Sequence, residues 1–250
     1  MRFLPAVDIL DGQAVRLLQG DYAAVTVFGD AEAVVGRLLA QGAKALHLVD
    51  LNAARDPKDR SNRQIIDRCL SQAREYKVMV ELGGGVRDKR AVSELFALGV
   101  DRVIIGTSAL ETKGWVLDLE EEWRPKLVLS LDFRMHDGEA FVVMDAWRRT
   151  SAFRLEEAVD DFSQQGFITQ LITPVSRDGM ASGPDLERYR QLVVDYPIDL
   201  IASGGIRDAR DLEALASIAP ARGRIEGAIV GTALYRGALS VPEGLIACSR

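Results

Sequence analysis

Two aspartates, Asp8 and Asp132, each directly follow a short apolar run, and they stand 124 residues apart. If the two runs are strands of one sheet, the carboxylates at their ends can face a shared ligand. One carboxylate can then remove a proton, while the other, kept protonated by burial or by nearby negative charge, donates one. An aspartate after a strand is also commonly a helix N-cap or a turn residue. The matched placement of these two favours a catalytic acid–base pair.

Glycine-rich segments occur as two matched sets. Residues 81–88 are echoed by residues 202–208, and residues 103–110 by residues 228–234, at offsets of 120 and 125 residues. Glycine lets backbone N–H groups approach an oxyanion closely, and a following helix points its positive end there. Tight strand-to-helix turns also use glycine for steric reasons alone, but two sets in register favour phosphate binding. The ligand would carry a phosphate at each end, held by Gly84, Gly85, Gly106 and Thr107 in one half and by Gly204, Gly205, Gly231 and Thr232 in the other.

Five further residues are candidates for the same site, and four of them have a plainer alternative. The hydroxyl of Thr173, at the end of a predicted strand, could hold a reacting carboxylate or a substrate oxygen. Asp178 lies in the loop that follows, where an Asp-Gly turn is a strong competing explanation. Arg16 and Trp147 could clamp an anionic or planar group, or could be a surface and a core residue. His47, within a predicted strand, could bind substrate, although such a histidine is more often a satisfied core residue.

Short apolar runs alternate with amphipathic stretches along the whole chain. Continuous apolar runs are typical of parallel strands buried on both faces. They predict strands at residues 3–7, 45–51, 78–82, 102–105, 126–131, 169–173, 199–202 and 227–230. The amphipathic stretches predict helices at residues 31–41, 62–73, 89–98, 155–165, 185–196 and 209–217.

This order of elements predicts an α/β fold, a closed (β/α)8 TIM barrel, because an open doubly wound sheet rarely needs so many consecutive units. The repeat of about half the chain predicts two half-barrels related by a two-fold axis. No linker divides the chain, so we expect a single barrel domain over residues 1–250. The stretches 20–30, 52–61 and 176–185 each follow a predicted strand and are expected as loops on the catalytic face.

Composition limits the partners that this chain is expected to have. The net charge of −6 argues against binding along a nucleic-acid backbone. Two cysteines and two histidines make a disulfide framework or a histidine-built metal site improbable. No apolar run reaches the roughly 18 residues of a membrane helix. We expect a cytoplasmic, metal-independent protein that binds a small molecule with two phosphates and no membrane.

Several motifs together resemble the HisA/HisF family over nearly the whole chain. They lie at residues 4–8, 15–22, 47–51, 83–87, 176–184, 202–206 and 230–235, mostly at the ends of predicted strands. The resemblance implies a half-barrel-symmetric (β/α)8 barrel that acts on a ligand with a phosphate at each end. It is strongest to the isomerases of histidine biosynthesis that act on phosphoribosylformimino-5-aminoimidazole carboxamide ribotide (ProFAR). That resemblance implies an Amadori rearrangement of an aminoaldose to an aminoketose, with no metal or organic cofactor.

By the same resemblance, Asp132 would be the acid that opens the ribose ring, Asp8 the base that shifts the proton from C2, and Thr173 an assisting residue. The segment 15–22 favours this isomerase over the family's cyclase, which depends on a glutaminase partner, and nothing in the sequence demands an obligate protein partner. A bifunctional isomerase that also takes phosphoribosylanthranilate is a closer alternative. Asp145, where that type has arginine, argues for the single function.

Two points of the resemblance stay open. The family usually has an acidic residue directly after the strand-six threonine, whereas this chain has Pro174, which makes the role of Asp178 harder to carry over. A barrel that binds a bisphosphate ligand without chemistry is the alternative from another functional class, and the paired Asp8 and Asp132 argue against it.

Overall fold

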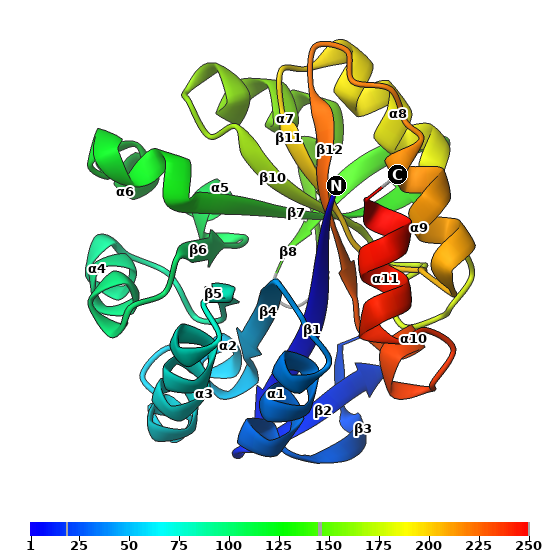
Figure 1. Ribbon diagram of the computed structural model, residues 1–250. Coiled ribbons are helices and arrows are strands. Elements are labelled where there is room, and N and C mark those ends of the chain that lie inside the picture. The colour runs from blue at the N-terminus through cyan, green and yellow to red at the C-terminus, as the bar shows by residue number, and fades with distance from the viewer. Residues whose placement is uncertain (19, 145–146, 250) are drawn as a thin grey trace.

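Eight parallel strands close into a barrel in the computed structural model, which describes residues 1–18, 20–144 and 147–249. The barrel closes where β12 pairs with β1 and where β10 pairs with β7 (Figure 1). The fold prediction from the sequence is therefore confirmed, and each predicted strand overlaps one barrel strand. In order round the barrel these are β1 (Arg2–Leu10), β4 (Ala45–Asp50), β5 (Met79–Gly83), β6 (Arg102–Ile105), β7 (Leu127–His136), β10 (Thr169–Pro174), β11 (Asp199–Ala202) and β12 (Arg224–Val230).

The strands are continuous apolar runs because both of their faces are buried. One set of side chains fills the inside of the barrel: Leu4, Ala6, Ala45, Ile104, Val128, Leu171, Ile201 and Ile229. Alternate residues of the same strands point outward and pack against the helices in a second, larger cluster. The interior is therefore a packed core below the mouth, which leaves the carboxyl ends of the strands to form a site.

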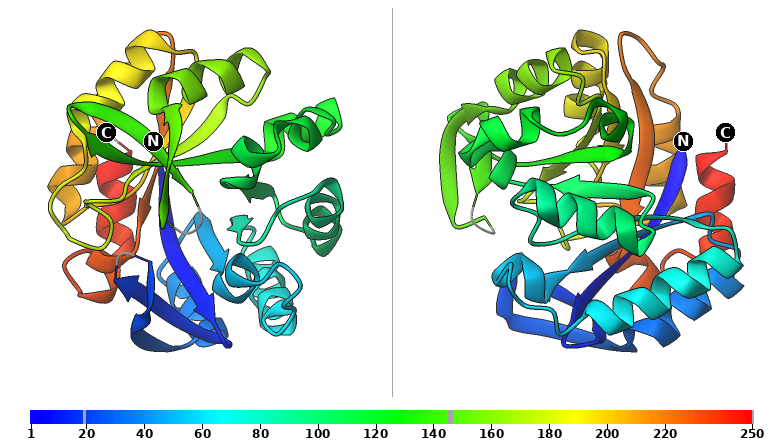
Figure 2. Two further views of the ribbon diagram at one scale, coloured as in Figure 1. Left: turned by 180° about the vertical axis from the view of Figure 1, so that it is seen from behind. Right: turned by 90° about the vertical axis from the view of Figure 1, so that its left-hand side faces the viewer.

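Helices surround the barrel, as Figures 1 and 2 show. Several begin at an aspartate whose side chain accepts a backbone N–H, such as Asp88 before α4 and Asp208 before α9. The six predicted helices are present, with ends shifted by a few residues at most. They are α1 (Ala31–Ala40), α3 (Arg63–Glu75), α4 (Lys89–Leu98), α7 (Leu155–Gln164), α8 (Leu186–Asp195) and α9 (Ala209–Ala216).

The sequence patterns missed the shorter helical elements. These are α2 (Leu51–Arg55), α5 (Ser108–Glu111), α6 (Lys113–Leu117), the 3-10 helix Glu121–Lys126, α10 (Thr232–Tyr235) and α11 (Val241–Cys248). Most span only one or two turns, which is too few residues for a helical period to emerge.

Two antiparallel extensions depart from the simple alternation of strand and helix. After β1 the chain forms β2 (Gln13–Leu18) and β3 (Asp21–Asp30), and after β7 it forms β8 (Glu139–Met144) and β9 (Arg149–Arg154). Both extensions lie at the end of the barrel away from the N-terminus (Figure 2). Each half-barrel thus carries an antiparallel extension after its first strand, which extends the predicted two-fold repeat.

The prediction that stretches 20–30 and 52–61 are loops was therefore partly wrong. Residues 21–30 form β3, and helix α2 occupies the start of the second stretch. The signal for the hairpin lay in Asp11-Gly12, whose φ angles of 49° and 78° make the tight turn between β1 and β2. The stretch 176–185 contains no helix or strand, as expected.

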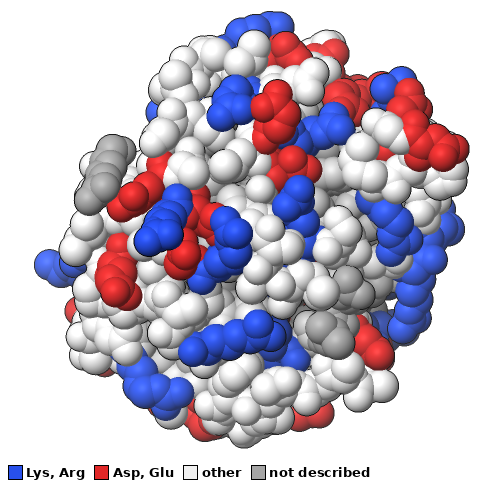
Figure 3. Space-filling model, turned by 90° about the vertical axis from the view of Figure 1, so that its right-hand side faces the viewer, with Lys and Arg blue, Asp and Glu red and all other residues white. Residues whose placement is uncertain are grey.

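Acidic and basic side chains are interspersed on the face that carries α8 and α9 (Figure 3). Such mixing does not create an extended field of one sign over that face. Among the described residues, none of the helices has the length and apolar character that crossing a bilayer would require.

Candidate active site

A cavity of about 520 Å³ opens at the carboxyl ends of the barrel strands. This volume falls in the range of pockets that enclose small-molecule ligands. The structure brings every site residue predicted from the sequence to the wall of this one cavity. They are Asp8, Arg16, His47, Gly84, Gly85, Gly106, Thr107, Asp132, Trp147, Thr173, Asp178, Gly204, Gly205, Gly231 and Thr232.

On one side of the cavity Arg16 joins two carboxylates. Its Nη1 donates to Asp8 Oδ2 at 3.0 Å, and its Nη2 donates to Asp178 Oδ1 at 2.5 Å. Burial raises the pKa of Asp178; Arg16 lowers it and the nearby charge of Asp8 raises it, with a net increase. Burial lowers the pKa of Arg16, but its two carboxylate partners more than offset this, so the guanidinium stays charged. Asp8 thus lies in direct contact with a charged guanidinium, at the wall of the cavity.

Asp132 has the opposite environment. Trp147 Nε1 donates to its Oδ2 at 2.7 Å, and the hydroxyl of Ser130 donates to its Oδ1 at 3.4 Å. Thr173 lies beside it, because Asp132 and Thr173 are register partners of β7 and β10. Burial raises the pKa of Asp132, and the hydrogen bonds from Trp147 and Thr173 offset this only in part. A raised pKa lets a carboxyl group keep its proton to higher pH than usual, which suits a general acid.

The structure excludes the plainer alternatives for Asp8, Asp132 and Arg16. Asp8 and Asp132 lie within β1 and β7 rather than at helix N-caps. Arg16 belongs to β2 and has a side chain only 21% exposed, so it is not a surface residue. Asp178 does lie in a turn, and there it also pairs with Arg16.

The Gly-Gly loops approach neighbouring backbone too closely for any side chain. A Cβ on Gly84 would lie 2.2 Å from the carbonyl oxygen of Asp50, and one on Gly85 would lie 2.3 Å from that of Ala53. In the second half, a Cβ on Gly205 would lie 2.3 Å from the carbonyl oxygen of Gly183. Close backbone packing alone therefore requires glycine at Gly84, Gly85 and Gly205, which is the steric alternative, and phosphate binding by these loops stays a prediction.

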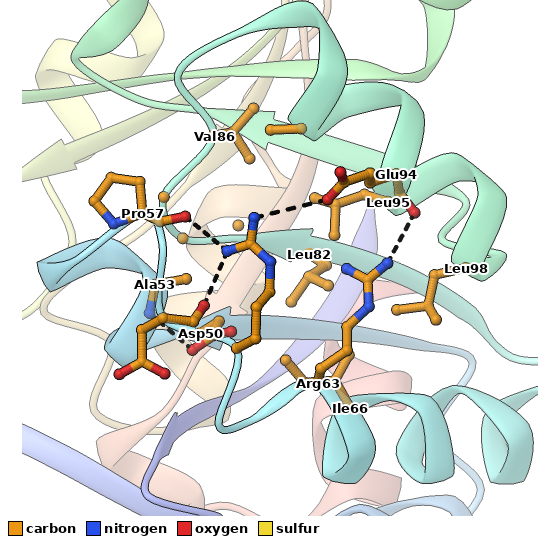
Figure 4. Close-up of a pocket in the computed structure, with 16 residues that line it drawn as sticks. Asp50, Ala53, Pro57, Arg63, Ile66, Leu82, Val86, Glu94, Leu95 and Leu98 are labelled. Carbon is orange, nitrogen blue, oxygen red and sulfur yellow. Dashed lines mark hydrogen bonds and ion pairs between the residues drawn. The ribbon is translucent and has the colours of Figure 1, made fainter.

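A much smaller cavity, of about 50 Å³, lies behind the Gly84–Gly85 loop, between α3 and α4 (Figure 4). Two arginines reach into it. Arg60 Nη1 donates to the carbonyl oxygen of Pro57 at 2.6 Å, and Arg63 Nη2 donates to that of Glu94 at 3.3 Å. Both guanidinium groups therefore already bind protein oxygens, and this space holds no more than a few water molecules. The chemistry belongs to the large cavity.

Sequence reasoning missed several residues of the cavity wall. Ser130 precedes Asp132 by two positions, so strand periodicity places both on one face and could have identified it. Arg55 ends α2, whereas Arg87 and Arg148 come from two different loops, and only the closed barrel brings all three to one cavity. Tyr22 and Arg55 both line the cavity, and the Arg55 guanidinium lies 5.6 Å from the centre of the Tyr22 ring.

Two further points of the sequence analysis concern Asp145 and metal binding. Asp145, on which the choice between one and two substrates depended, lies outside the described residues. Within the described residues, no group of three or more histidine, cysteine or acidic side chains is arranged to hold a metal ion. Cys69 and Cys248 are buried free thiols.

The fold is a half-barrel-symmetric (β/α)8 barrel, and its cavity holds two aspartates and two glycine loops. A family described as histidine biosynthesis protein matches residues 2–240, and the chain belongs to it. The resemblance noted in the sequence is thereby confirmed.

Curated relatives match the chain over nearly its full length. One from Microcystis aeruginosa is 39% identical over 99% of this chain and 94% of its own. One from Chloroflexus aurantiacus is 37% identical over 98% of this chain and 97% of its own, and one from Actinobacillus pleuropneumoniae is 36% identical over 97% and 95%. All three are named 1-(5-phosphoribosyl)-5-((5-phosphoribosylamino)methylideneamino) imidazole-4-carboxamide isomerase.

Proposed function

We propose that this protein isomerises ProFAR, the substrate in the names of its relatives, to the corresponding aminoketose in histidine biosynthesis. The observation that carries the proposal is the contrast between two carboxylates of one cavity. Asp8 is ion-paired with Arg16, whereas burial raises the pKa of Asp132. An aldose–ketose rearrangement needs one proton donor and one proton acceptor at neighbouring substrate atoms.

In the first step, Asp132 gives its proton to the ring oxygen of the ribose. The bond between that oxygen and C1 breaks, and the nitrogen lone pair forms a C1=N double bond. Trp147 and Thr173 then stabilise the carboxylate that Asp132 has become, since both hydrogen-bond to it. Asp132 can therefore lose its proton without leaving a bare buried charge.

In the second step, Asp8 removes the proton from C2. The electrons of the C–H bond form a C1=C2 double bond, and the iminium electrons return to nitrogen. The resulting enolamine becomes the aminoketose when C1 takes up a proton and the C2 hydroxyl loses one. Asp178 reaches Asp8 through Arg16, so the position of the base depends on both halves of the barrel.

The two glycine loops would hold the terminal phosphates. Backbone N–H groups of Gly84 and Gly85 serve one phosphate, and those of Gly204 and Gly205 serve the other. Thr232 supports this assignment, because its Oγ1 is buried without a hydrogen-bond partner among the described residues and faces the same wall. The reaction as written moves protons only. It calls for no metal ion, organic cofactor or protein partner.

A steady-state assay of the purified protein with ProFAR and with phosphoribosylanthranilate tests the proposal. Turnover of ProFAR alone supports a single-function isomerase, whereas turnover of both substrates supports the bifunctional type. Asp8→Asn is the matched variant, since it keeps the size of the side chain and removes the base. A folded wild-type protein that converts neither substrate refutes the proposed function.

A further inference from the structure

A polar pair, His47 and Glu81, lies among the apolar side chains of the inner wall of the barrel. His47 Nδ1 lies 2.7 Å from Glu81 Oε1, and the two residues are register partners of β4 and β5. Glu81 has no exposed surface, and His47 is only 6% exposed. Unlike Glu81, His47 lines the cavity, and because Nδ1 is engaged by Glu81, its Nε2 is the nitrogen left for a ligand.

The hydrogen bonding of this buried pair is incomplete. Glu81 Oε2 is buried without a hydrogen-bond partner among the described residues. An unsatisfied buried carboxylate oxygen costs free energy, and replacing a buried ion pair by well-packed apolar residues is often neutral or stabilising. A role in binding explains why these two residues are polar.

The other half-barrel shows what such an apolar replacement looks like. At the equivalent place, Leu171 of β10 and Ile201 of β11 are register partners, 124 and 120 residues after His47 and Glu81. These are the same offsets that relate the two aspartates and the two Gly-Gly pairs. Both residues belong to the inner core cluster, and Leu171 lines the cavity as His47 does. The two halves therefore differ here by a hydrogen-bonding group against an alkyl group.

A ligand with two phosphates can bind in this cavity in either of two opposite orientations. Matched glycine loops at both ends accept either phosphate, and each half supplies an aspartate. Only one orientation of the ligand, however, brings the correct carbon to Asp8 and the ring oxygen to Asp132. An enzyme of this proposed function therefore needs a group that distinguishes the halves of its substrate.

We propose that His47, held in place by Glu81, selects the productive orientation of the two-ended substrate. His47 hydrogen-bonds a polar group of the substrate half that occupies the first half-barrel. In the reversed orientation, the part of the ligand beside His47 does not hydrogen-bond it. The polar group then lies against Leu171. His47 is thus a specificity-determining residue, Glu81 is its positioning residue, and the inference rests on the proposed function.

The test gives both half-barrels the same apolar pair, in the double variant His47→Leu/Glu81→Ile. Phosphorus NMR of the protein saturated with the aminoketose product reports the orientation, because each phosphate has a distinct environment in each loop. The wild type should show one pair of bound resonances, and the variant should show a second pair from the reversed ligand. We expect kcat/KM to fall about tenfold, the value of one hydrogen bond, and kcat to fall about twofold from the reversed population.

The second-half variant Leu171→Met/Ile201→Val is the matched control, since it changes the other pair without adding a polar group. It should keep one pair of resonances. If the first variant does not fold, Leu171→His/Ile201→Glu carries the same test, because it makes both halves polar and should also admit the reversed ligand.

A single pair of resonances in a folded, symmetrised variant overturns the role of His47 and Glu81 while leaving the isomerase assignment intact. Failure of the wild type to bind the product overturns the proposed function itself, and this inference with it.

Discussion

Replacing Asp132 by asparagine separates its role as an acid from its role in packing. The amide has the shape of a protonated carboxyl group. Its oxygen can accept the Trp147 Nε1–H bond that now measures 2.7 Å, and its NH2 group can donate to Ser130, now at 3.4 Å. What the variant loses is the proton that the carboxyl group can give away.

The expected effects on activity and stability have opposite directions. A general acid contributes about 100- to 10,000-fold to a rate, which corresponds to about 3–5 kcal/mol. Burial raises the pKa of Asp132 in the folded protein, so the folded form binds the proton more tightly than the unfolded chain does. This contribution to stability is complete below the unfolded pKa and is lost as the pH rises through the folded pKa. At neutral pH the asparagine variant should therefore melt at or above the temperature of the wild type.

The assay pairs two measurements on the same preparation. The rate of aminoketose formation is followed at saturating ProFAR, and thermal unfolding is followed from pH 4 to pH 8. The melting temperature of Asp132→Asn relative to wild type should increase across this range, while turnover falls at least about 100-fold. Turnover within about tenfold of wild type would refute the assignment of Asp132 as the acid. A variant that becomes relatively less stable as the pH rises would refute the burial argument.

Three further predictions follow from the same contacts. Trp147→Phe removes a hydrogen bond from the indole N–H that favours the carboxylate of Asp132, so the pKa of Asp132 should rise further. The alkaline limb of the kcat/KM profile should then move to higher pH, and an unmoved limb would contradict this. Arg16→Gln removes the cation between two carboxylates and should lower kcat/KM about 100-fold in steady-state assays. Arg16→Lys should restore only part of the activity, because an ammonium group cannot bind both carboxylates with the forked geometry of a guanidinium. Full activity of the glutamine variant would contradict this. Gly85→Ala places a Cβ 2.3 Å from a backbone carbonyl at φ +69° and should cost about 2 kcal/mol or more, a loss of about 4–8 °C in Tm by differential scanning fluorimetry. Gly106→Ala meets no atom within 4 Å and is its control; equal losses in both contradict the steric argument.

The fold and the residues that line the cavity could largely be predicted from the sequence, because the chain repeats itself. Eight continuous apolar runs suffice to predict a closed barrel, and strand ends in a barrel meet at one mouth. Two aspartates at matched positions then had to face one ligand. That reasoning used only local pattern and offset, so it did not depend on knowing any contact.

Long-range partners were beyond such reasoning. The bond from Arg16 to Asp178 joins residues 162 positions apart and depends on how β2 folds back over the mouth. Glu81 resembled the start of a glycine loop, and only the register of β4 with β5 places it against His47. The roles of acid and base came from the family resemblance, and the burial and hydrogen-bond partners of Asp132 that support them are not revealed by any spacing.

The contact between Gly20 and Trp147 gives one small position an influence far from its own loop. A Cβ on Gly20 would lie 3.1 Å from the indole, so any side chain there pushes against a ring whose N–H holds Asp132. The side chain allowed at Gly20, between β2 and β3, is thus restricted by a ring that hydrogen-bonds the proposed acid in the other half-barrel. A substitution at Gly20 would therefore change the pH dependence of the enzyme more readily than it changes the conformation of the loop.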